Sequence, residues 1–289
     1  MSACFGPAGN CDSFSKVHKS SVEAPEWVRA FGLDCYEYQC GKGIHVGEAT
    51  ARAVGRAAQK AGISLSLHAP YFINLANPDP DSLKKTIGYI TGSCLVADQM
   101  GAVRVVIHSG ALMKRSRTQA LEIAKQSLKE VIAACDDAGF GHITLCPETM
   151  GKINQLGDLD EVLELCLLDQ RLVPCIDFGH LYARSLGKDD GERAMERMLD
   201  RVEEALGEER ASRFHSHFSH IQFTPNGGEK CHRTFDDDDG YGPDWSPLAR
   251  AVARRGWSPT FICESAGTQA EDALTMKQIY QAACQSYLK

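Results

Sequence analysis

Hydrophobic positions along the chain alternate between short apolar runs rich in β-branched residues and longer segments where apolar residues recur every three or four positions. Short runs bounded by turn residues are typical of buried strands, and the longer period is typical of amphipathic helices. Strands are expected at residues 2–6, 33–38, 63–68, 103–108, 142–147, 173–177, 217–223 and 259–263. Helices are expected near residues 23–31, 46–61, 80–100, 116–138, 157–168, 190–206, 244–255 and 268–285.

This alternation favours a (β/α)8 TIM barrel, in which each of eight parallel strands is followed by a helix. Several predicted helices end on a glycine directly before the next strand, as is typical of αβ turns, at Gly62, Gly101, Gly139 and Gly256. The competing arrangement is a doubly wound open sheet, which usually carries a glycine-rich phosphate-binding turn after its first strand. The segment GPAGN at residues 6–10 is not such a turn. We therefore expect residues 1–289 to form a single TIM-barrel domain.

Composition and charge narrow the class of protein. The 289 residues are 43% hydrophobic and 24% charged, which suits a packed core and is not typical of a disordered chain. A formal net charge of -7 argues against coating nucleic acid by bulk charge, although it is compatible with a local basic groove. The sequence shows neither the roughly 20-residue apolar run of a membrane span nor a secretion signal. We expect a cytoplasmic enzyme with no membrane association and no obligate protein partner.

Twelve cysteines are many for a cytoplasmic chain, but their spacing is irregular and no CxxC pair occurs. A disulfide framework would require an exported protein. We therefore interpret most of them, including Cys146, Cys175 and Cys263 in apolar runs, as small core residues.

Candidate metal ligands lie where the predicted strands end. Imidazoles or carboxylates occupy this position on six strands, at His68, His108, Glu148, Asp177, His220 and Glu264, and His180 and His232 lie in the loops that follow. The C-terminal strand ends of a barrel share one mouth. Histidine and carboxylate together form the ligand set of zinc, manganese and iron, and without a cation the carboxylates would repel one another. The sequence predicts a metal centre there and does not distinguish zinc from manganese.

Each of these residues, taken alone, also has a simpler role. A single histidine at a strand end is usually structural, and Asp177 is also placed to cap the turn that follows it. Six such residues at one mouth are much harder to explain in this way. The remaining histidines are interpreted as ordinary structural residues: His18, His45, His142, His215 and His217.

Six motifs in order resemble endonuclease IV, the zinc-dependent apurinic/apyrimidinic endonuclease family of the xylose-isomerase-like barrel superfamily. They are HAPYFINL from His68, IHSG with His108, PETMG with Glu148, CIDFGH with Asp177 and His180, SHIQF with His220 and ICES with Glu264. The resemblance implies a first zinc ion on His68, His108 and Glu148. It implies a second on Glu148, Asp177, His220 and Glu264. His180 and His232 would help to hold a third.

The resemblance also implies an activity, a partner and substrate contacts. The family cleaves the backbone of damaged double-stranded DNA 5′ to an abasic site during repair, using a hydroxide formed from a metal-activated water. Glu148 would be catalytic as the bridging ligand, and Tyr71 matches an aromatic position that touches substrate. Cationic residues of the predicted βα loops are candidate phosphate contacts: Lys114, Arg115, Arg117, Arg184 and Arg233. The acidic run at residues 236–239 would oppose DNA binding if it faced the mouth.

One position departs from the family pattern. The third zinc ion normally takes an Asp-x-His pair, and here Lys230 stands in the place of the aspartate before His232. A charged lysine is a donor only and cannot bind a metal. Glu229 replaces the aspartate if the loop shifts by one residue, or Cys231 acts as a soft ligand. We favour a third alternative, in which Lys230 is a catalytic point charge that contacts a substrate phosphate. It predicts two bound zinc ions and leaves the third site open.

Two other functions compete with the endonuclease. A single-metal sugar or cyclitol isomerase or epimerase of the same superfamily would need only Glu148, Asp177, His220 and Glu264. A non-enzymatic barrel that holds metal is the third possibility. The additional imidazoles favour the endonuclease, because a one-metal isomerase has no evident need of His68, His108, His180 and His232.

Overall fold

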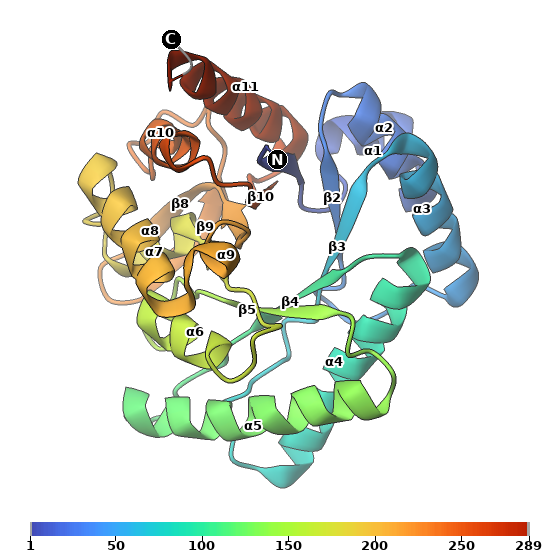
Figure 1. The fold of residues 1–289 in the computed structure, drawn as a ribbon, viewed down its shortest axis with the longest axis vertical. Coiled ribbons are helices and arrows are strands. Elements are labelled where there is room, and N and C mark those ends of the chain that lie inside the picture. The colour runs from blue at the N-terminus through green and yellow to red at the C-terminus, as the bar shows by residue number, and fades with distance from the viewer. Residues whose placement is uncertain (1, 288–289) are drawn as a thin grey trace.

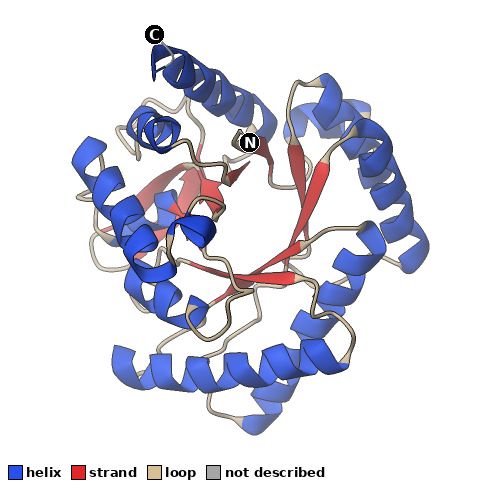
Figure 2. Ribbon diagram, viewed as in Figure 1, coloured by secondary structure: helices blue, strands red, loops and turns tan. Residues whose placement is uncertain are grey.

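The computed structural model describes residues 2–287 and places eight parallel strands around a central axis, with helices outside them (Figures 1 and 2). The strands are β1 (Cys4–Pro7), β2 (Cys35–Gln39), β3 (Ser64–His68), β4 (Arg104–His108), β5 (Thr144–Glu148), β6 (Cys175–Asp177), β7 (His215–Phe218) and β10 (Thr260–Cys263). Their order in the sheet is β1-β10-β7-β6-β5-β4-β3-β2. The ring closes between β1 and β2, where the Gly9 amide donates to the Glu37 carbonyl at 2.9 Å. The predicted (β/α)8 barrel is confirmed.

Helices connect the strands and cover the outside of the barrel. They are α1 (Asp12–Val17), η1 (Ser21–Glu23), α2 (Ala24–Ala30), α3 (Glu48–Ala61), α4 (Pro80–Met100), α5 (Arg117–Asp137), α6 (Leu159–Cys166), α7 (Phe178–Arg184), α8 (Glu192–Leu206), α9 (Glu208–Ala211), α10 (Trp245–Arg255) and α11 (Gln269–Tyr287). The eight predicted helices are all present, within about two residues of their expected bounds. The short elements α1, η1, α7 and α9 were not predicted, because helices of one or two turns carry too few apolar repeats.

Helix α5 shows how the sequence determines these elements. Ser116 caps it by accepting a hydrogen bond from the Gln119 amide, while the Gln119 side chain accepts one from the Ser116 amide. Its residues that repeat every three or four positions, Ala124, Leu128 and Val131 among them, are fully buried against the barrel. The hydrophobic period read from the sequence is therefore the face that packs.

The seventh strand differs from the expectation. The predicted strand at residues 217–223 covers parts of two elements: barrel strand β7, and β8 (His220–Thr224), which pairs with β9 (Gly228–Arg233) in an antiparallel hairpin. The barrel register aligns His215 with Cys175 and His217 with Asp177. The apolar run that suggested one strand contains residues of two elements. Phe218 belongs to β7 and packs outside the barrel, whereas Ile221 belongs to the hairpin.

The hydrophobic core lies between the strands and the outer helices. An aromatic cluster fills it where β1, β7 and β10 meet α10, with Trp245 in contact with Phe5, Phe218 and Phe261. Most of the twelve cysteines are buried, which confirms their interpretation as small core residues. Among residues 2–287, no helix combines the length and apolar character that crossing a bilayer requires.

Closure of the barrel depends on a glycine in β1. A Cβ atom on Gly6 would lie 1.8 Å from the carbonyl oxygen of Cys35, so β1 can approach β2 only without a side chain there. We expect Gly6→Ala to lower the free energy of unfolding by about 3 kcal/mol, since backbone must move to relieve the overlap. Gly88→Ala is the matched control. Gly88 is exposed on α4 with open space around it, and alanine should stabilise the helix by roughly 0.5–1 kcal/mol.

Urea denaturation followed by circular dichroism measures both effects. A Gly6→Ala protein as stable as wild type would show that the approach of β1 to β2 does not limit barrel closure.

Candidate metal centre

A cavity of about 430 Å³ opens where the barrel strands end. Its lining comes from strand ends, the loops that follow them and the β8–β9 hairpin, and consists of His68, Tyr71, His108, Glu148, Met150, Lys152, Gln155, His180, Glu229, His232 and Glu264. The fold therefore brings most of the candidate imidazoles and carboxylates together at one mouth, as the sequence predicted.

Glu148 lies at the centre of this cavity, at the end of β5 and almost fully buried. Its Oε2 is 3.3 Å from Nε2 of His68 and 3.4 Å from Nε2 of His108. Its Oε1 is 2.9 Å from Nδ1 of His217. Each carboxylate oxygen thus faces a different set of imidazoles, which is the arrangement a bridging ligand requires.

The hydrogen bonds of His68 show what this arrangement lacks. Nδ1 of His68 lies 2.7 Å from the Ala69 carbonyl, which can only accept, so Nδ1 carries the hydrogen. Nε2 of a neutral His68 then directs its lone pair at Glu148 Oε2, another acceptor. Two acceptors at 3.3 Å need a cation between them, either a proton or a metal ion. The residues present therefore fit a divalent cation.

Asp177 gives a second, independent sign of a cation site. Its Oδ1 caps α7 by accepting from the His180 amide at 2.8 Å, as the capping interpretation anticipated. Its Oδ2 is buried and, among the described residues, receives no hydrogen bond. Nδ1 of His180 is only 3.2 Å away, but its hydrogen goes to the Thr149 carbonyl at 2.8 Å. A buried carboxylate oxygen without a partner is costly, and a bound cation would offset that cost.

The ligand atoms fall into groups of metal-site size. Those of Glu148, Asp177, His217 and Glu264 lie within 4.8 Å of one another. A second group at the outer side of the cavity comprises His180, Glu229 and His232, again within 4.8 Å. These nitrogens and oxygens are the donor types of zinc and manganese sites.

A β-bulge places Glu229 and His232 on the same side. Side chains three positions apart in a regular strand point to opposite faces. Gln222 pairs with Cys231 and Phe223 pairs with Glu229, so Lys230 has no partner across the hairpin. This extra residue resets the alternation, and both Glu229 and His232 reach the cavity.

The bulge places the residues of the three alternatives left open for this loop in different positions. Lys230 is exposed and does not line the cavity, in contrast to the favoured alternative. The Cys231 thiol points to the Gln222 side chain, with Sγ 3.3 Å from Oε1. Glu229 has the position that the sequence suggested for a loop shifted by one residue, with Oε2 3.6 Å from Nε2 of His180.

His220 is the predicted ligand that the structure does not bring to the cavity. It begins β8, outside the barrel, and its ring stacks on Phe235 at 4.7 Å. Burial lowers the pKa of His220. His217, two residues after the start of β7, takes the expected place beside Glu148. His217 was interpreted from the sequence as an ordinary structural residue, and the signal for its position was the pair of histidines at alternate positions, His215 and His217, in HSHF at residues 215–218.

Titratable groups in the cavity have pKa values shifted in opposite directions. Burial lowers the pKa of His108 to about 3. Burial also opposes protonation of His180, but the charges of Asp177 and Glu229 outweigh it and raise its pKa to about 9. Burial of Glu148 is likewise outweighed by His217 and His68, which hold its pKa well below the ordinary value. Opposed shifts of this kind within one cavity are typical of functional sites.

The predicted substrate contacts divide into two sets. Tyr71 lines the cavity, with its ring stacked on His108 at 5.5 Å and 55% of its surface exposed. Lys114 is exposed and Arg115 is half-buried, both in the β4–α5 loop and outside the cavity lining. These three side chains remain available for a ligand.

The other three arginines already have partners within the protein. Arg184 donates to the carbonyls of Met150, Lys152 and Gln155 and so holds the loop after β5. Arg117 forms an ion pair with Glu161. Arg233 pairs with residues of the acidic run, Asp237 and Asp239, which directs these charges at each other rather than at a ligand.

Two further residues were not anticipated from the sequence. Lys152 and Gln155 line the cavity from the loop after Glu148. That loop contacts the hairpin, because the Ile153 amide donates to the Gly227 carbonyl at 3.2 Å. A cation shortly after a strand-end carboxylate was a signal in the sequence, but its side chain could not be placed without this loop contact.

Together the fold and the cavity define a TIM barrel with a histidine- and carboxylate-rich centre at its C-terminal mouth. The chain belongs to the xylose isomerase-like TIM barrel family, whose sequence profile matches residues 25–285. An uncharacterized protein of Methanocaldococcus jannaschii is 30% identical over 273 residues, which cover 94% of this chain and 95% of that protein.

Proteins named as endonucleases and as epimerases are among those that this chain resembles. A probable endonuclease 4 of Acholeplasma laidlawii is 29% identical over 133 residues, covering 43% of this chain, and this match spans less than half of its length. Endonuclease IV from Thermus thermophilus superposes with a TM-score of 0.65 at 18% identity, covering 92% of this chain and 94% of that one. A D-tagatose 3-epimerase-like protein superposes with a TM-score of 0.69 at 15% identity, covering 89% and 91%. These structural similarities establish the fold and not the reaction.

The hairpin geometry predicts how metal uptake depends on two adjacent residues. We expect wild-type protein saturated with Zn²⁺ to bind three equivalents and Glu229→Gln to bind two. The glutamine amide lacks the negative charge that the Glu229 carboxylate supplies beside His180 and His232. Lys230→Gln is the matched control and should still bind three, since Lys230 lies outside the cavity. Equilibrium dialysis with elemental analysis measures the equivalents. Loss of an equivalent in Lys230→Gln but not in Glu229→Gln would contradict this account of the bulge.

Proposed function

We propose that this protein is a metal-dependent phosphodiesterase that cleaves double-stranded DNA at abasic sites. The observation that carries the proposal is the second ligand group, His180, Glu229 and His232, beside the group around Glu148. A single-metal enzyme has no need of it, whereas several cations in one cavity suit the charge of a phosphodiester and its leaving oxygen. The resemblance to endonuclease IV and the endonuclease relatives support the same activity.

The residues of the cavity would have separate roles in holding cations and in contacting the substrate. His68, His108 and Glu148 would hold one cation, and Glu148, Asp177, His217 and Glu264 a second, with zinc favoured and manganese compatible. Bound cations would supply Lewis acidity and increase the acidity of a coordinated water. Glu148 places two ligand groups at a fixed separation. Lys152 offers a positive charge at the cavity wall for a substrate phosphate.

The loops around the cavity form a connected rim that suits damaged DNA. The Ala111 amide donates to Asn74 Oδ1 at 3.0 Å, and the Leu112 amide donates to the Asn154 carbonyl at 3.1 Å, so neighbouring loops support each other. Large apolar side chains are exposed on these loops at Tyr71, Phe72, Met113 and Ile153. Apolar side chains of this kind enter between bases and widen a duplex where it is weak. An unpaired abasic position is such a weak point.

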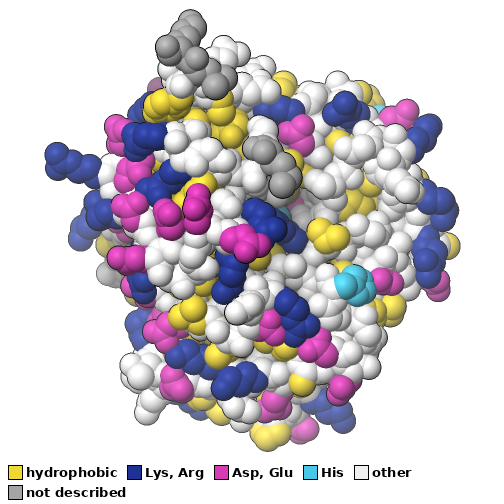
Figure 3. Space-filling model, in the orientation of Figure 1, with side chains coloured by type: hydrophobic (Ala, Val, Ile, Leu, Met, Phe, Trp, Pro, Cys, Tyr) yellow, Lys and Arg dark blue, Asp and Glu magenta, His cyan; other side chains and the backbone are white. Residues whose placement is uncertain are grey.

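The face of the molecule drawn in Figure 3 does not have the character of a nucleic-acid surface. Basic and acidic side chains are interspersed over it, without a continuous basic patch. Electrostatic attraction of DNA requires basic residues gathered on one surface. General surface charge on this face is therefore not expected to attract DNA.

A specific observation keeps a second function in view. Glu148, Asp177, His217 and Glu264 by themselves form a group of the size that holds one cation, and sugar epimerases are among the structural neighbours. In that function the cation would polarise a hydroxy-carbonyl substrate while carboxylates move its proton. His217 replaces His220 in this set.

A duplex that carries one tetrahydrofuran abasic analogue tests the proposed function. We expect the Zn²⁺- or Mn²⁺-loaded protein to nick the strand 5′ to the analogue, with loss of nicking in chelator and recovery when metal is restored. An undamaged duplex of the same sequence is the control substrate. The opposite outcome is a metal-loaded protein that leaves the analogue intact but converts a ketose to its C3 epimer. That outcome would contradict the endonuclease proposal and support the epimerase.

Glu148→Gln tests the central ligand in the same assay. Losing one negative charge from a carboxylate that serves two ligand groups should lower nicking by at least about 100-fold. Measurement of bound Zn²⁺ in the variant separates lost metal from lost folding, which circular dichroism reports independently. Nicking at the wild-type rate would remove Glu148 from the centre of the site.

A further inference from the structure

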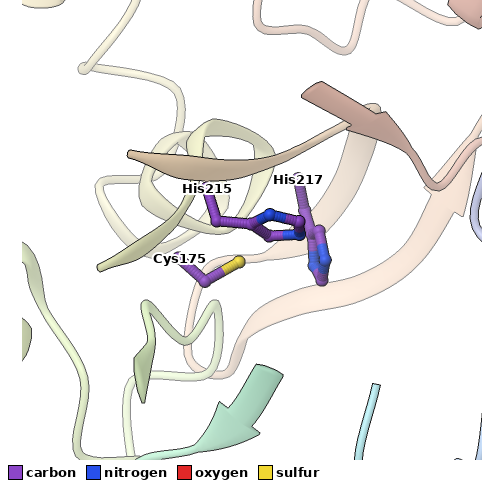
Figure 4. Close-up of side chains that lie close together, drawn as sticks. All are labelled: Cys175, His215 and His217. Atoms are coloured by element: carbon purple, nitrogen blue, oxygen red, sulfur yellow. The ribbon is translucent and has the colours of Figure 1, made fainter. Parts of the chain in front are cut away.

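A chain of buried polar side chains runs along the barrel axis beneath the cavity. TIM-barrel interiors are usually filled by branched apolar residues. Here Glu37, His215 and His217 are all fully buried inside the barrel, below the mouth. Figure 4 shows the two imidazoles of β7 lying close together, with the thiol of Cys175 on the neighbouring strand directed at them. Buried charge in this position requires an explanation, because apolar residues would fill the space at lower cost.

Glu37 is an acceptor for four donors. Its Oε1 lies 2.9 Å from Nε2 of His217 and 3.1 Å from Nε2 of Gln39. Its Oε2 lies 2.8 Å from Nε2 of His215 and 2.8 Å from Oγ of Ser66. All four bonds are satisfied when the carboxylate is ionised and each imidazole carries a hydrogen on Nε2.

The other face of His215 supports this assignment. Nη1 of Arg104 lies 3.5 Å from Nδ1 of His215, and a guanidinium can only donate. Nδ1 of His215 is therefore the acceptor and Nε2 the donor. His215 thus anchors Glu37 from one side while Glu37 holds His217 on the other.

We propose that Glu37 is a positioning residue that fixes the tautomer of His217 and presents its Nδ1 to the cation shared by Glu148, Asp177 and Glu264. Nδ1 of His217 is 2.9 Å from Glu148 Oε1 and 3.5 Å from Glu264 Oε1. With one hydrogen held on Nε2 by Glu37, a neutral His217 has its lone pair on Nδ1, and a bound cation would take the place of a second hydrogen in the contact to Glu148. The inference rests on the proposed metal centre and assigns a role to a strand that supplies no ligand itself.

His217 differs from the other oriented imidazoles of the cavity. His68 and His180 donate to the backbone carbonyls of Ala69 and Thr149. His217 instead donates to a buried carboxylate, which increases the basicity of the ring and its strength as a ligand. Loss of this carboxylate should therefore weaken the metal that binds His217 without removing any ligand.

A metal ion inside the barrel is the competing explanation. Ligand atoms of Cys175, His215 and His217 lie within 4.8 Å of one another. However, the contacts of Glu37 to both imidazoles, 2.8 and 2.9 Å, are hydrogen-bond lengths. The structure therefore favours a hydrogen-bonded chain.

The tautomer can be measured on the wild-type protein. Two-bond ¹H–¹⁵N correlation spectra of ¹⁵N-histidine-labelled, Zn²⁺-loaded protein report which nitrogen of each ring carries the hydrogen, and His217→Gln assigns the signal. We expect His217 to be protonated on Nε2 with Nδ1 bound to metal. A hydrogen on Nδ1, or metal on Nε2, would overturn the proposal.

Glu37→Gln tests the consequence. We expect a loss of about 10- to 100-fold in Zn²⁺ affinity, measured by competition with a chromophoric chelator, with unchanged equivalents at saturation. Melting of the metal-free variant reports structural damage separately. Cys175→Ser is the matched buried control and should keep wild-type affinity and stoichiometry.

The remaining outcomes are distinguishable. Wild-type affinity in Glu37→Gln overturns the positioning role, and loss of one equivalent in Cys175→Ser overturns it in favour of an interior metal site. A wild-type protein that binds no metal overturns the proposed function and this inference together. A wild-type protein that binds metal and shows the expected tautomer but nicks no abasic DNA overturns the endonuclease alone.

Discussion

The structure is organised around lone pairs that face one another across a buried cavity. His68 Nε2 meets Glu148 Oε2, and Asp177 Oδ2 receives no hydrogen bond from any described residue although it is buried. Backbone carbonyls fix the hydrogens of His68 and His180 on the far side of each ring. When these imidazoles are neutral, the facing nitrogen and oxygen atoms are all acceptors and cannot satisfy one another. Under the proposed function a divalent cation would resolve this conflict, and the other features of the mouth would follow from the positions of its ligands.

The barrel supplies this arrangement because parallel strands deliver their last residues to one circle. Glu148 ends β5, and Asp177 ends β6 and caps α7 with one oxygen while the other is buried without a hydrogen-bond partner among the described residues. The hairpin β8–β9 adds the ligands that no strand end provides, since the bulge at Lys230 turns Glu229 and His232 to the same side. Under the proposed function, one inserted residue would compensate for a changed ligand position without change to the barrel.

The sequence allowed the barrel and most of the mouth to be predicted, and it failed where two strands share one apolar run. Strand ends at His68, His108 and Glu148 could be read because a turn follows each directly. At residues 215–224 the chain leaves the barrel and starts a hairpin after one residue, so periodicity assigned His220 to the place of His217. The role of Glu37 could not be predicted for another reason. The hydrogen-bond partners that stabilise its buried carboxylate come from strands distant in sequence, which a local pattern cannot show.

The polar interior bears on how much of this site can vary. The chain from Arg104 through His215 and Glu37 to His217 crosses the barrel between its two ends. Each member satisfies its neighbour, so replacing one leaves a buried donor or acceptor unpaired, whereas replacing all of them together by apolar residues could leave the barrel stable. Stability alone therefore does not account for this row of hydrogen-bonded polar side chains. The tautomer of the His217 ring does, because it is the one property that this set of hydrogen bonds fixes and an apolar core cannot.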